Sequence, residues 1–323
     1  MRTKVCAVAV GAVAALVLSG CSGSEPGADG GESSGPTAVT VGVLPIVPSA
    51  AMQLGIDQGI FADHGFDVTL ETGQGGAALL PAVVSQKMDF ALSNPLSVML
   101  AQEQGLDVRL ITGYSHSKTE GDDVTSVWAA PGSGIETPAD LAGKTVAVNT
   151  LKTMGEVSIR EIVEQDGGDP ASVQFVEMGF PDMPAALDGG NVDAVWVPEP
   201  FQTQLAEAGN TRVAYNYQDV FPGVMTMGVL TSGALAEKSP DMVAEFTAAV
   251  DEVTAYAQEH PEDVATALSG FLDMPEDVAG SLVMEDFRAD IDADAMQTLA
   301  DLSVDDGILA EPVDMGTFLP SAG

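Results

Sequence analysis

The chain has 323 residues and carries 48 Asp and Glu side chains against 11 Lys and Arg, a formal net charge of −37 at pH 7. A surface this acidic repels nucleic acid, so we expect no nucleic-acid partner. The negative charge is explained equally well by a salt-tolerant soluble surface and by a role in ligand binding. The two cysteines, Cys6 and Cys21, lie near the N-terminus, which excludes disulfides, thiolate nucleophiles and cysteine metal sites from the body of the chain.

The N-terminal segment has the pattern of an export signal. An apolar run of 14 residues, Val5–Leu18, follows Arg2 and Lys4, and this length is typical of a secretory signal peptide rather than of a membrane-spanning helix. The run ends in LSGC, which resembles the lipobox of bacterial lipoproteins, where the cysteine is diacylated. We therefore expect a lipoprotein signal peptide over residues 1–20 and a palmitate-type lipid anchor on Cys21. An ordinary signal peptide with an incidental cysteine is the alternative.

Residues 21–37 combine this cysteine with a stretch of Gly, Ser, Pro and acidic residues that has nothing to bury. Such a composition predicts a flexible tether. No later run of 18 apolar residues occurs in the sequence. We therefore expect a soluble body that the lipid holds at the extracytoplasmic face of the cell membrane.

From residue 38 onward the sequence alternates between strand and helix patterns. Buried or alternating apolar runs predict strands at 38–46, 66–71, 88–93, 107–113, 172–178, 192–197, 224–232 and the second half of 137–150. Helical periodicity predicts helices at 51–65, 75–86, 95–105, 155–168, 182–190, 199–209, 241–260 and the first half of 137–150. This alternation indicates an α/β fold with parallel sheets.

Two segments, 79–95 and 182–200, repeat one unit of helix, turn, aspartate-led strand and polar-proline corner, which predicts two similar lobes. We expect lobe 1 to comprise residues 38–131 and 224–323 and lobe 2 to comprise residues 132–223. The chain would then cross between the lobes near Pro131–Glu136 and Tyr215–Gly223, and its C-terminal helices would pack back on lobe 1.

Four segments in this order carry a family resemblance: LGIDQGIFADHGFDVTLETGQGGAALLPAVVSQKMDFALSNP, AQEQGLDVRLITG, IETPADLAGKTVAVNT and ALDGGNVDAVWVPEPF. Together, behind a lipobox, they resemble the substrate-binding proteins of bacterial ABC importers, in the group that binds nitrate, sulfonates, taurine and thiamine-pyrimidine precursors. The likeness covers roughly residues 40–235. It implies a two-lobed type II periplasmic-binding-protein fold with a ligand cleft between the lobes and a two-strand hinge.

The resemblance also implies a function. It predicts a monomeric solute-binding protein without enzymatic activity or cofactor, whose partners are a small-molecule solute, an ABC permease and its ATPase. Two other classes stay open: a surface receptor without transport, and an enzyme like the pyrimidine-precursor synthase that shares this fold. That synthase relies on a lysine–cofactor linkage, a histidine and a cysteine-rich segment, and the body of this chain has no cysteine.

Ligands of open α/β sheets lie beyond the carboxyl ends of strands, where helix N-termini present free N–H groups. On this basis we expect the following ligand-binding residues: Pro48, Ser49, Gly75, Gly76, Ser93, Asn94, Tyr114, Thr150, Lys152, Asp182, Trp196 and Glu199. Ser93 and Asn94 are equally good helix caps, and Trp196 and Phe180 equally good core residues. Met227 is a better core residue than a cleft residue.

Near these strand ends the cations are Lys118 and Lys152, whereas Asp122, Asp123, Asp182 and Glu199 supply carboxylates. Carboxylates accept hydrogen bonds from amino groups, and aromatic rings stack on flat rings. The sequence therefore favours a nitrogenous, aminopyrimidine-like solute, with an organosulfonate, taurine or nitrate as the alternative. We expect no metal site, because the three histidines are scattered through the chain without metal-ligand spacing.

Overall fold

The computed structural model describes residues 35–320. The expected signal peptide, the lipidated Cys21 and nearly all of the tether lie outside the described residues. They remain predictions.

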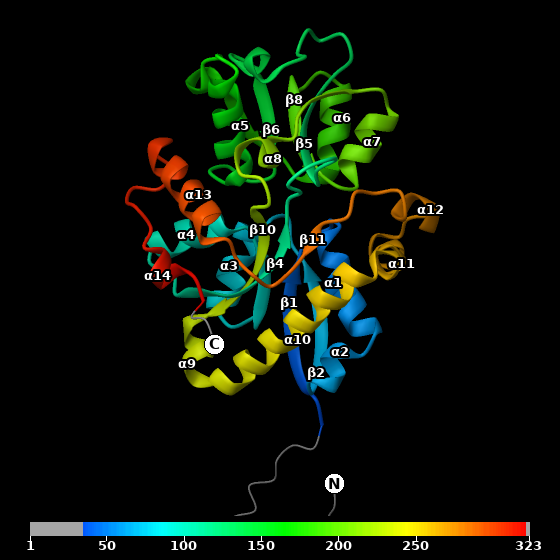
Figure 1. Cartoon of the computed structure of the whole chain (residues 1–323), viewed down its shortest axis with the longest axis vertical. Coiled ribbons are helices and arrows are strands. Elements are labelled where there is room, and N and C mark those ends of the chain that lie inside the picture. The colour runs from blue at the N-terminus through cyan, green and yellow to red at the C-terminus, as the bar shows by residue number, and fades with distance from the viewer. Residues whose placement is uncertain (1–34, 321–323) are drawn as a thin grey trace, which may run out of the picture. The chain divides into compact units, whose positions relative to one another are not determined.

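The first lobe is built on a six-stranded sheet with the order β11-β4-β10-β3-β1-β2 (Figure 1). Its strands are β1 (Thr37–Val43), β2 (Phe66–Thr72), β3 (Phe90–Ser93), β4 (Val108–His116), β10 (Met225–Ser232) and β11 (Asp286–Phe287). β1 is parallel to β2 and β3, whereas β10 is antiparallel to both β3 and β4. The carboxyl ends of β1 and β3 therefore reach the same edge of this sheet.

Helices cover both faces of the first sheet: α1 (Pro48–Asp57), α2 (Ile60–Asp63), α3 (Gly76–Val84), α4 (Pro95–Glu103), α9 (Gly233–Lys238) and α10 (Pro240–Glu259). Helix α11 (Pro261–Leu272) packs on α1 and α10, and α12 (Glu276–Ala279) packs on α11. The long helix α10 crosses β4 and packs on α1 and α2. Its fully buried Phe246 stacks on Phe90, with ring centroids 3.8 Å apart, and on Phe61 at 5.6 Å. This aromatic stack joins the C-terminal helices to the core of the first lobe.

The second lobe is built on a five-stranded sheet with the order β7-β6-β8-β5-β9. Its strands are β5 (Thr125–Ala129), β6 (Thr145–Val148), β7 (Gln174–Glu177), β8 (Ala194–Pro198) and β9 (Thr211–Ala214). The helices around it are α5 (Met154–Gln165), α6 (Met183–Asp188), α7 (Phe201–Glu207) and α8 (Asn216–Val220), together with short 3₁₀ turns η1 (Pro138–Leu141), η2 (Pro170–Ser172) and η3 (Phe180–Asp182). The two-lobed α/β fold predicted from the sequence is confirmed.

Two strands of the second sheet, β5 and β9, have no counterpart among the predicted elements. β5 pairs antiparallel with β8 and β9, so it lies in the second sheet although it precedes the crossing expected near Pro131–Glu136. The chain leaves the first sheet after His116 and enters the second at Thr125. β5 reads TSVWA, which is neither a continuous apolar run nor the apolar–polar alternation of a half-buried strand.

The two segments that link the sheets run side by side. β4 and β10 are neighbours in the first sheet, and beyond their paired ends the Ser117 N–H donates a hydrogen bond to the Val224 carbonyl at 2.9 Å. Residues 117–124 and 215–224 thus form a two-segment hinge.

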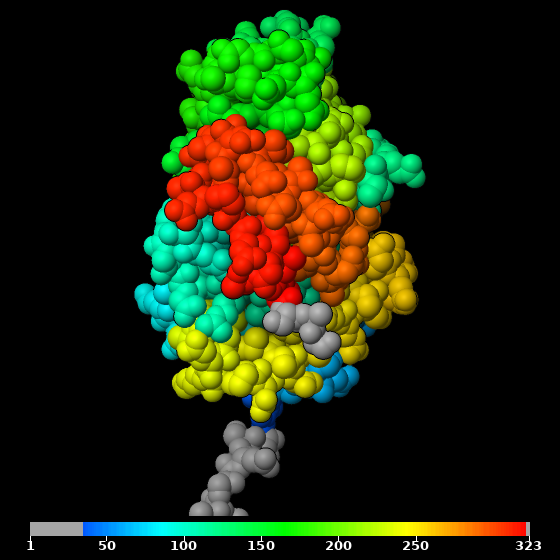
Figure 2. Space-filling view, turned by 60° about the vertical axis from the view of Figure 1, so that its left-hand side comes forward, coloured from blue at the N-terminus to red at the C-terminus, as the bar shows by residue number. Residues whose placement is uncertain are grey.

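The C-terminal segment is a further connection between the lobes. Helix α13 (Ala293–Asp305) packs on α4 of the first lobe and on α5 of the second, and is followed by α14 (Met315–Phe318). Figure 2 shows these orange and red residues as a continuous strip across the boundary between the lobes. From the sequence we expected the C-terminal helices to pack on the first lobe alone, and α13 differs from that expectation. Helical periodicity shows that a helix has an apolar face, but it does not show against which lobe that face packs.

Candidate functional site

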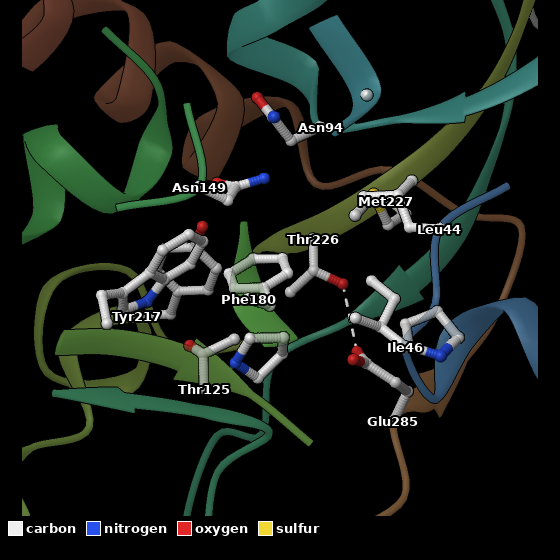
Figure 3. A pocket seen from close by; sticks show the side chains of 14 residues that line it. Leu44, Ile46, Asn94, Thr125, Asn149, Phe180, Tyr217, Thr226, Met227 and Glu285 are labelled. Atoms are coloured by element: carbon white, nitrogen blue, oxygen red, sulfur yellow. Dashed lines mark hydrogen bonds between the residues drawn. The ribbon is translucent and has the colours of Figure 1, made fainter. Parts of the chain in front are cut away.

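A cavity of about 440 Å³, including its opening to solvent, lies between the two sheets (Figure 3). Both lobes, the hinge and the C-terminal segment line it: Leu44, Ile46, Pro48, Gly76, Asn94, Thr125, Asn149, Phe180, Trp196, Pro198, Tyr217, Thr226, Met227 and Glu285.

The first lobe contributes the starts of three helices to the cavity wall. The chain enters α1 at Pro48, α3 at Gly76 and α4 at Asn94. Asn94 caps α4: its side-chain oxygen accepts a hydrogen bond from the Ser97 N–H at 2.9 Å. Gly76 leaves no room for a side chain, because a Cβ atom there would lie 2.8 Å from the Ser93 Cα. The starts of α3 and α4 bring backbone N–H groups close to the cavity, whereas α1 begins with Pro48 and its Ser49 and Ala50 N–H groups donate to the Ile46 and Val47 carbonyls.

The second lobe contributes an aromatic wall. The rings of Phe180 and Trp196 meet edge to face with centroids 5.6 Å apart, and Trp196 and Tyr217 are also 5.6 Å apart. All three side chains are buried. Three aromatic rings on one wall suit a flat, partly apolar ligand.

Glu285 is the only carboxyl group on the cavity wall among the described residues. It is 5% exposed, and its Oε2 accepts a hydrogen bond from the Thr226 hydroxyl at 3.1 Å (Figure 3). The Thr226 hydroxyl is in turn 2.8 Å from the Ser115 hydroxyl. Burial raises the pKa of Glu285 well above its usual range, and the nearby negative charge of Asp123 raises this pKa further.

Asp123 connects the two hinge segments. Its Oδ1 accepts hydrogen bonds from the N–H groups of Lys118 and Val124, and its Oδ2 accepts one from the Gln218 N–H at 3.2 Å. Burial raises the pKa of Asp123 to about 6 despite these donors. The hinge therefore holds a carboxyl group that titrates close to neutral pH.

Two fully buried side-chain atoms of the cavity-lining residues have no hydrogen-bond partner within residues 35–320: the Trp196 Nε1 and the Thr125 Oγ1. The two residues lie on neighbouring strands β8 and β5, with Thr125 opposite Pro198 and Trp196 opposite Val127. A buried polar group without a partner costs about 1–3 kcal/mol. A ligand with polar groups at this wall would offset that cost.

The structure brings four of the residues predicted from the sequence to the cavity: Pro48, Gly76, Asn94 and Trp196. Five more lie just behind its wall: Ser49, Ser93, Tyr114, Gly75 and Thr150. Tyr114 supports the wall, because its hydroxyl donates a hydrogen bond to the Pro48 carbonyl at 2.7 Å. Gly75 and Thr150 face each other across the lobes, and a Cβ on Gly75 would lie 2.8 Å from the Thr150 Oγ1.

The remaining three predicted residues do not line the cavity. Lys152 lies beside a separate hollow against α3 and α4, with its N–H bonded to the Glu156 carboxylate at 2.8 Å. Asp182 is exposed at the end of a 3₁₀ turn. Glu199 is buried, but its carboxylate accepts hydrogen bonds from the Thr203 hydroxyl at 2.9 Å and the Val283 N–H at 3.2 Å. Each follows a strand end, yet the loop turns the side chain away.

Several cavity residues were not in the predicted set: Leu44, Thr125, Asn149, Pro198, Tyr217, Thr226 and Glu285, with Ile46, Phe180 and Met227. Phe180 was weighed against a core role, and Met227 was expected in the core. Thr125 was missed together with its strand β5. Glu285 lies in an irregular segment before β11, where neither periodicity nor a strand end marks it.

Among residues 35–320, no group of three or more His, Cys, Asp and Glu side chains is placed to hold a metal ion. None of the helices in that part of the chain is long and apolar enough to cross a membrane.

A family model described as "NMT1/THI5 like" matches residues 49–264, more than half of the chain. The chain belongs to the NMT1/THI5-like family. No similar protein was found among curated sequences. This membership supports the resemblance to the nitrate, sulfonate, taurine and thiamine-pyrimidine-precursor group that the sequence indicated. The matched region ends before Glu285 and the last helices.

Solved structures share the fold of this NMT1/THI5-like chain at low sequence identity. The periplasmic aliphatic sulphonate-binding protein SsuA of Escherichia coli superposes with a TM-score of 0.71 at 20% identity, covering 88% of this chain and 97% of that one. The periplasmic nitrate-binding protein NrtA of Synechocystis PCC 6803 superposes with a TM-score of 0.72 at 13% identity, covering 87% and 84%. The desulfurization enzyme DSZB gives a TM-score of 0.65 at 15% identity, covering 88% and 97%. The fold therefore occurs in binding proteins and in an enzyme.

Proposed function

We propose that this chain is the extracytoplasmic solute-binding component of an ABC importer. It holds a small nitrogenous, aminopyrimidine-like solute between its lobes and delivers it to a membrane permease. The observation that carries the proposal is the cavity itself, since both lobes and the hinge contribute to its wall. A ligand that contacts both lobes stabilises the arrangement in which the lobes are closed together, because it makes more contacts there than when the lobes are apart. A permease can then distinguish the closed, ligand-bound protein from the open, empty one.

The composition of the wall supports a nitrogenous solute. Three aromatic rings, the Glu285 carboxyl group and the amide of Asn149 lie together, and no Lys or Arg lines the cavity within the described residues. A flat ring with amino groups would stack on the aromatic wall and donate hydrogen bonds to acceptors. Lys118, the nearest candidate cation in the hinge, forms an ion pair with Asp286 instead.

An organosulfonate, taurine or nitrate is the second candidate ligand. The starts of α3 and α4 at the cavity wall offer backbone N–H donors that suit an anion. Two of the structurally similar proteins are named as sulphonate-binding and nitrate-binding. This candidate requires that N–H donors alone offset the negative charge in a site without a cationic side chain.

Thermal unfolding of the soluble body, residues 22–323, with a panel of solutes tests the proposal. The panel contains 4-amino-5-hydroxymethyl-2-methylpyrimidine, taurine, ethanesulfonate and nitrate. A ligand at about 100 times its dissociation constant adds about 2.7 kcal/mol, which raises the melting temperature by several degrees for a protein of this size. A shift with the pyrimidine alone supports the nitrogenous solute. A shift with the anions alone replaces it by the second candidate, and no shift with any solute contradicts the solute-binding role.

We also propose that Cys21 anchors the protein through lipid, that the soluble body is a monomer, and that it binds without catalysis. Replacement of Cys21 by Ser is expected to move the protein from the membrane fraction to the soluble fraction. Light scattering of residues 22–323 is expected to give the monomer mass. Prolonged incubation with a bound solute is expected to return it chemically unchanged, as judged by mass spectrometry, and a product would show an enzyme.

A further inference from the structure

The carboxyl group of Glu285 has an unusual setting for a group that faces a ligand cavity. Within residues 35–320, the Thr226 hydroxyl is the only protein group that hydrogen bonds to it, and it bonds only to Oε2. A carboxyl group has about four acceptor positions when ionised. The Oε1 atom of Glu285 and one acceptor position of its Oε2 are therefore left for a ligand.

The segment that carries Glu285 is fixed to both lobes. At residue 283 the backbone N–H donates to the Glu199 carboxylate of the second lobe at 3.2 Å. At residues 286 and 287 the segment pairs with His116 and Ser115 of β4 in the first lobe. Glu285 lies between these attachments, so its carboxyl group is positioned with respect to both walls of the cavity.

The charges around Glu285 favour its neutral form. Asp123 in the hinge and the adjacent Asp286 both disfavour a negative charge on Glu285. The Thr226 hydrogen bond and Lys118, which pairs with Asp286, favour that charge but only partly offset burial and the two aspartates. The other titratable groups close by, the phenols of Tyr114 and Tyr217, are buried and uncharged at neutral pH. A neutral carboxyl group presents one O–H donor beside one acceptor oxygen.

We propose that Glu285 selects the solute by pairing this donor–acceptor edge with an amino group and an adjacent unprotonated ring nitrogen of the ligand. The ligand amino group donates to one oxygen, and the carboxyl O–H donates to the ring nitrogen. The chain Ser115–Thr226–Glu285 orients the edge, since the Thr226 hydroxyl lies 2.8 Å from the Ser115 hydroxyl and donates to Oε2. This inference rests on the proposed solute-binding function and assigns the selective contact to a segment outside the matched family region.

Calorimetric titration with 4-amino-5-hydroxymethyl-2-methylpyrimidine tests the assignment on residues 22–323. Glu285→Met removes both polar atoms and is expected to weaken binding at least 100-fold. Glu285→Gln keeps a donor beside an acceptor and is expected to stay within about tenfold of the wild type. Glu259→Gln removes an exposed carboxylate on α10, outside the cavity wall and the hinge, and is expected to change nothing. Equal affinity of Glu285→Met and the wild type would overturn the proposal.

A ligand comparison on the wild type keeps the test independent of variant folding. The same pyrimidine without its 4-amino group is expected to bind at least tenfold more weakly, and equal binding of the two would overturn the proposal. Binding of taurine or nitrate but not of the pyrimidine would overturn the role of Glu285 while the solute-binding function stands. Binding of none of these probes would contradict both.

Discussion

Gly75, just before α3, lies against Thr150 of the second lobe. A Cβ atom on Gly75 would lie 2.8 Å from the Thr150 Oγ1 and 3.1 Å from the Asn149 Nδ2. Gly75 has φ −174° and ψ 157°, an extended conformation that alanine adopts without strain. Gly75→Ala should therefore disturb the contact between the lobes and leave the fold of each lobe intact.

Overpacking of a close contact costs about 1–3 kcal/mol. Since the added methyl group meets the second lobe only when the lobes are close, this cost falls on the closed state. At 1.4 kcal/mol for each factor of ten, Gly75→Ala is expected to weaken solute binding about 5-fold to 140-fold. The melting temperature without ligand should change by less than a few degrees.

Calorimetric titration of the solute that emerges from the panel measures this effect. Gly270→Ala is the matched control, because a Cβ there meets no atom within 4 Å, and its affinity should equal that of the wild type. Adding Thr150→Ala to Gly75→Ala removes the nearer of the two contacts and should restore part of the affinity. Unchanged binding by Gly75→Ala would refute the reasoning that ligand binding requires this contact between lobes.

Three further predictions concern stability, each measured by urea unfolding. Phe246→Ala removes the ring stacked in the first-lobe core and should cost about 3–5 kcal/mol; a loss below 1 kcal/mol would contradict the packing. His64 lies between two α10 glutamates, at 2.6 and 3.0 Å, and hydrogen bonds to them raise its pKa above 6.5. The ion pairs of protonated His64 should add about 0.2–1 kcal/mol to the free energy of unfolding, as exposed ion pairs do. This contribution should be full below pH 6.5 and disappear as the pH rises through the raised pKa of His64. His64→Gln should abolish this pH dependence. For Asp123, whose pKa is raised from 3.8 to about 6, the unfolded chain loses the proton first, so stability should fall between about pH 4 and 6. Asp123→Asn should flatten that part of the profile, and an unchanged slope would contradict the assignment.

The overall fold could be predicted from the sequence because most of its helices and strands are marked by patterns of neighbouring residues. Parallel strands such as β1 are buried apolar runs bounded by turn residues, and α10 repeats apolar residues at helical spacing. By contrast, β5 reads TSVWA, neither an apolar run nor an alternation, so no local pattern marked it as a strand. Its lobe is decided by pairing with β8, about 70 residues later in the chain.

The residues of the cavity wall could likewise be predicted only where a local pattern marks them. Pro48, Gly76 and Asn94 follow strand ends in the first lobe, and the general geometry of α/β sheets brings such residues together. Lys152 and Glu199 also follow strand ends, but the conformation of a loop decides where its side chains lie. Glu285 reaches the wall only because β11 adds to the far edge of the first sheet, a contact that no local pattern encodes.

A crystal structure of residues 22–323 with 4-amino-5-hydroxymethyl-2-methylpyrimidine would test the central claim most directly. We expect the pyrimidine ring to lie against Phe180, Trp196 and Tyr217, with its amino edge on Glu285 and with contacts from both lobes. A pyrimidine bound to one lobe alone, or outside this cavity, would contradict the claim that the protein holds its solute between the two lobes.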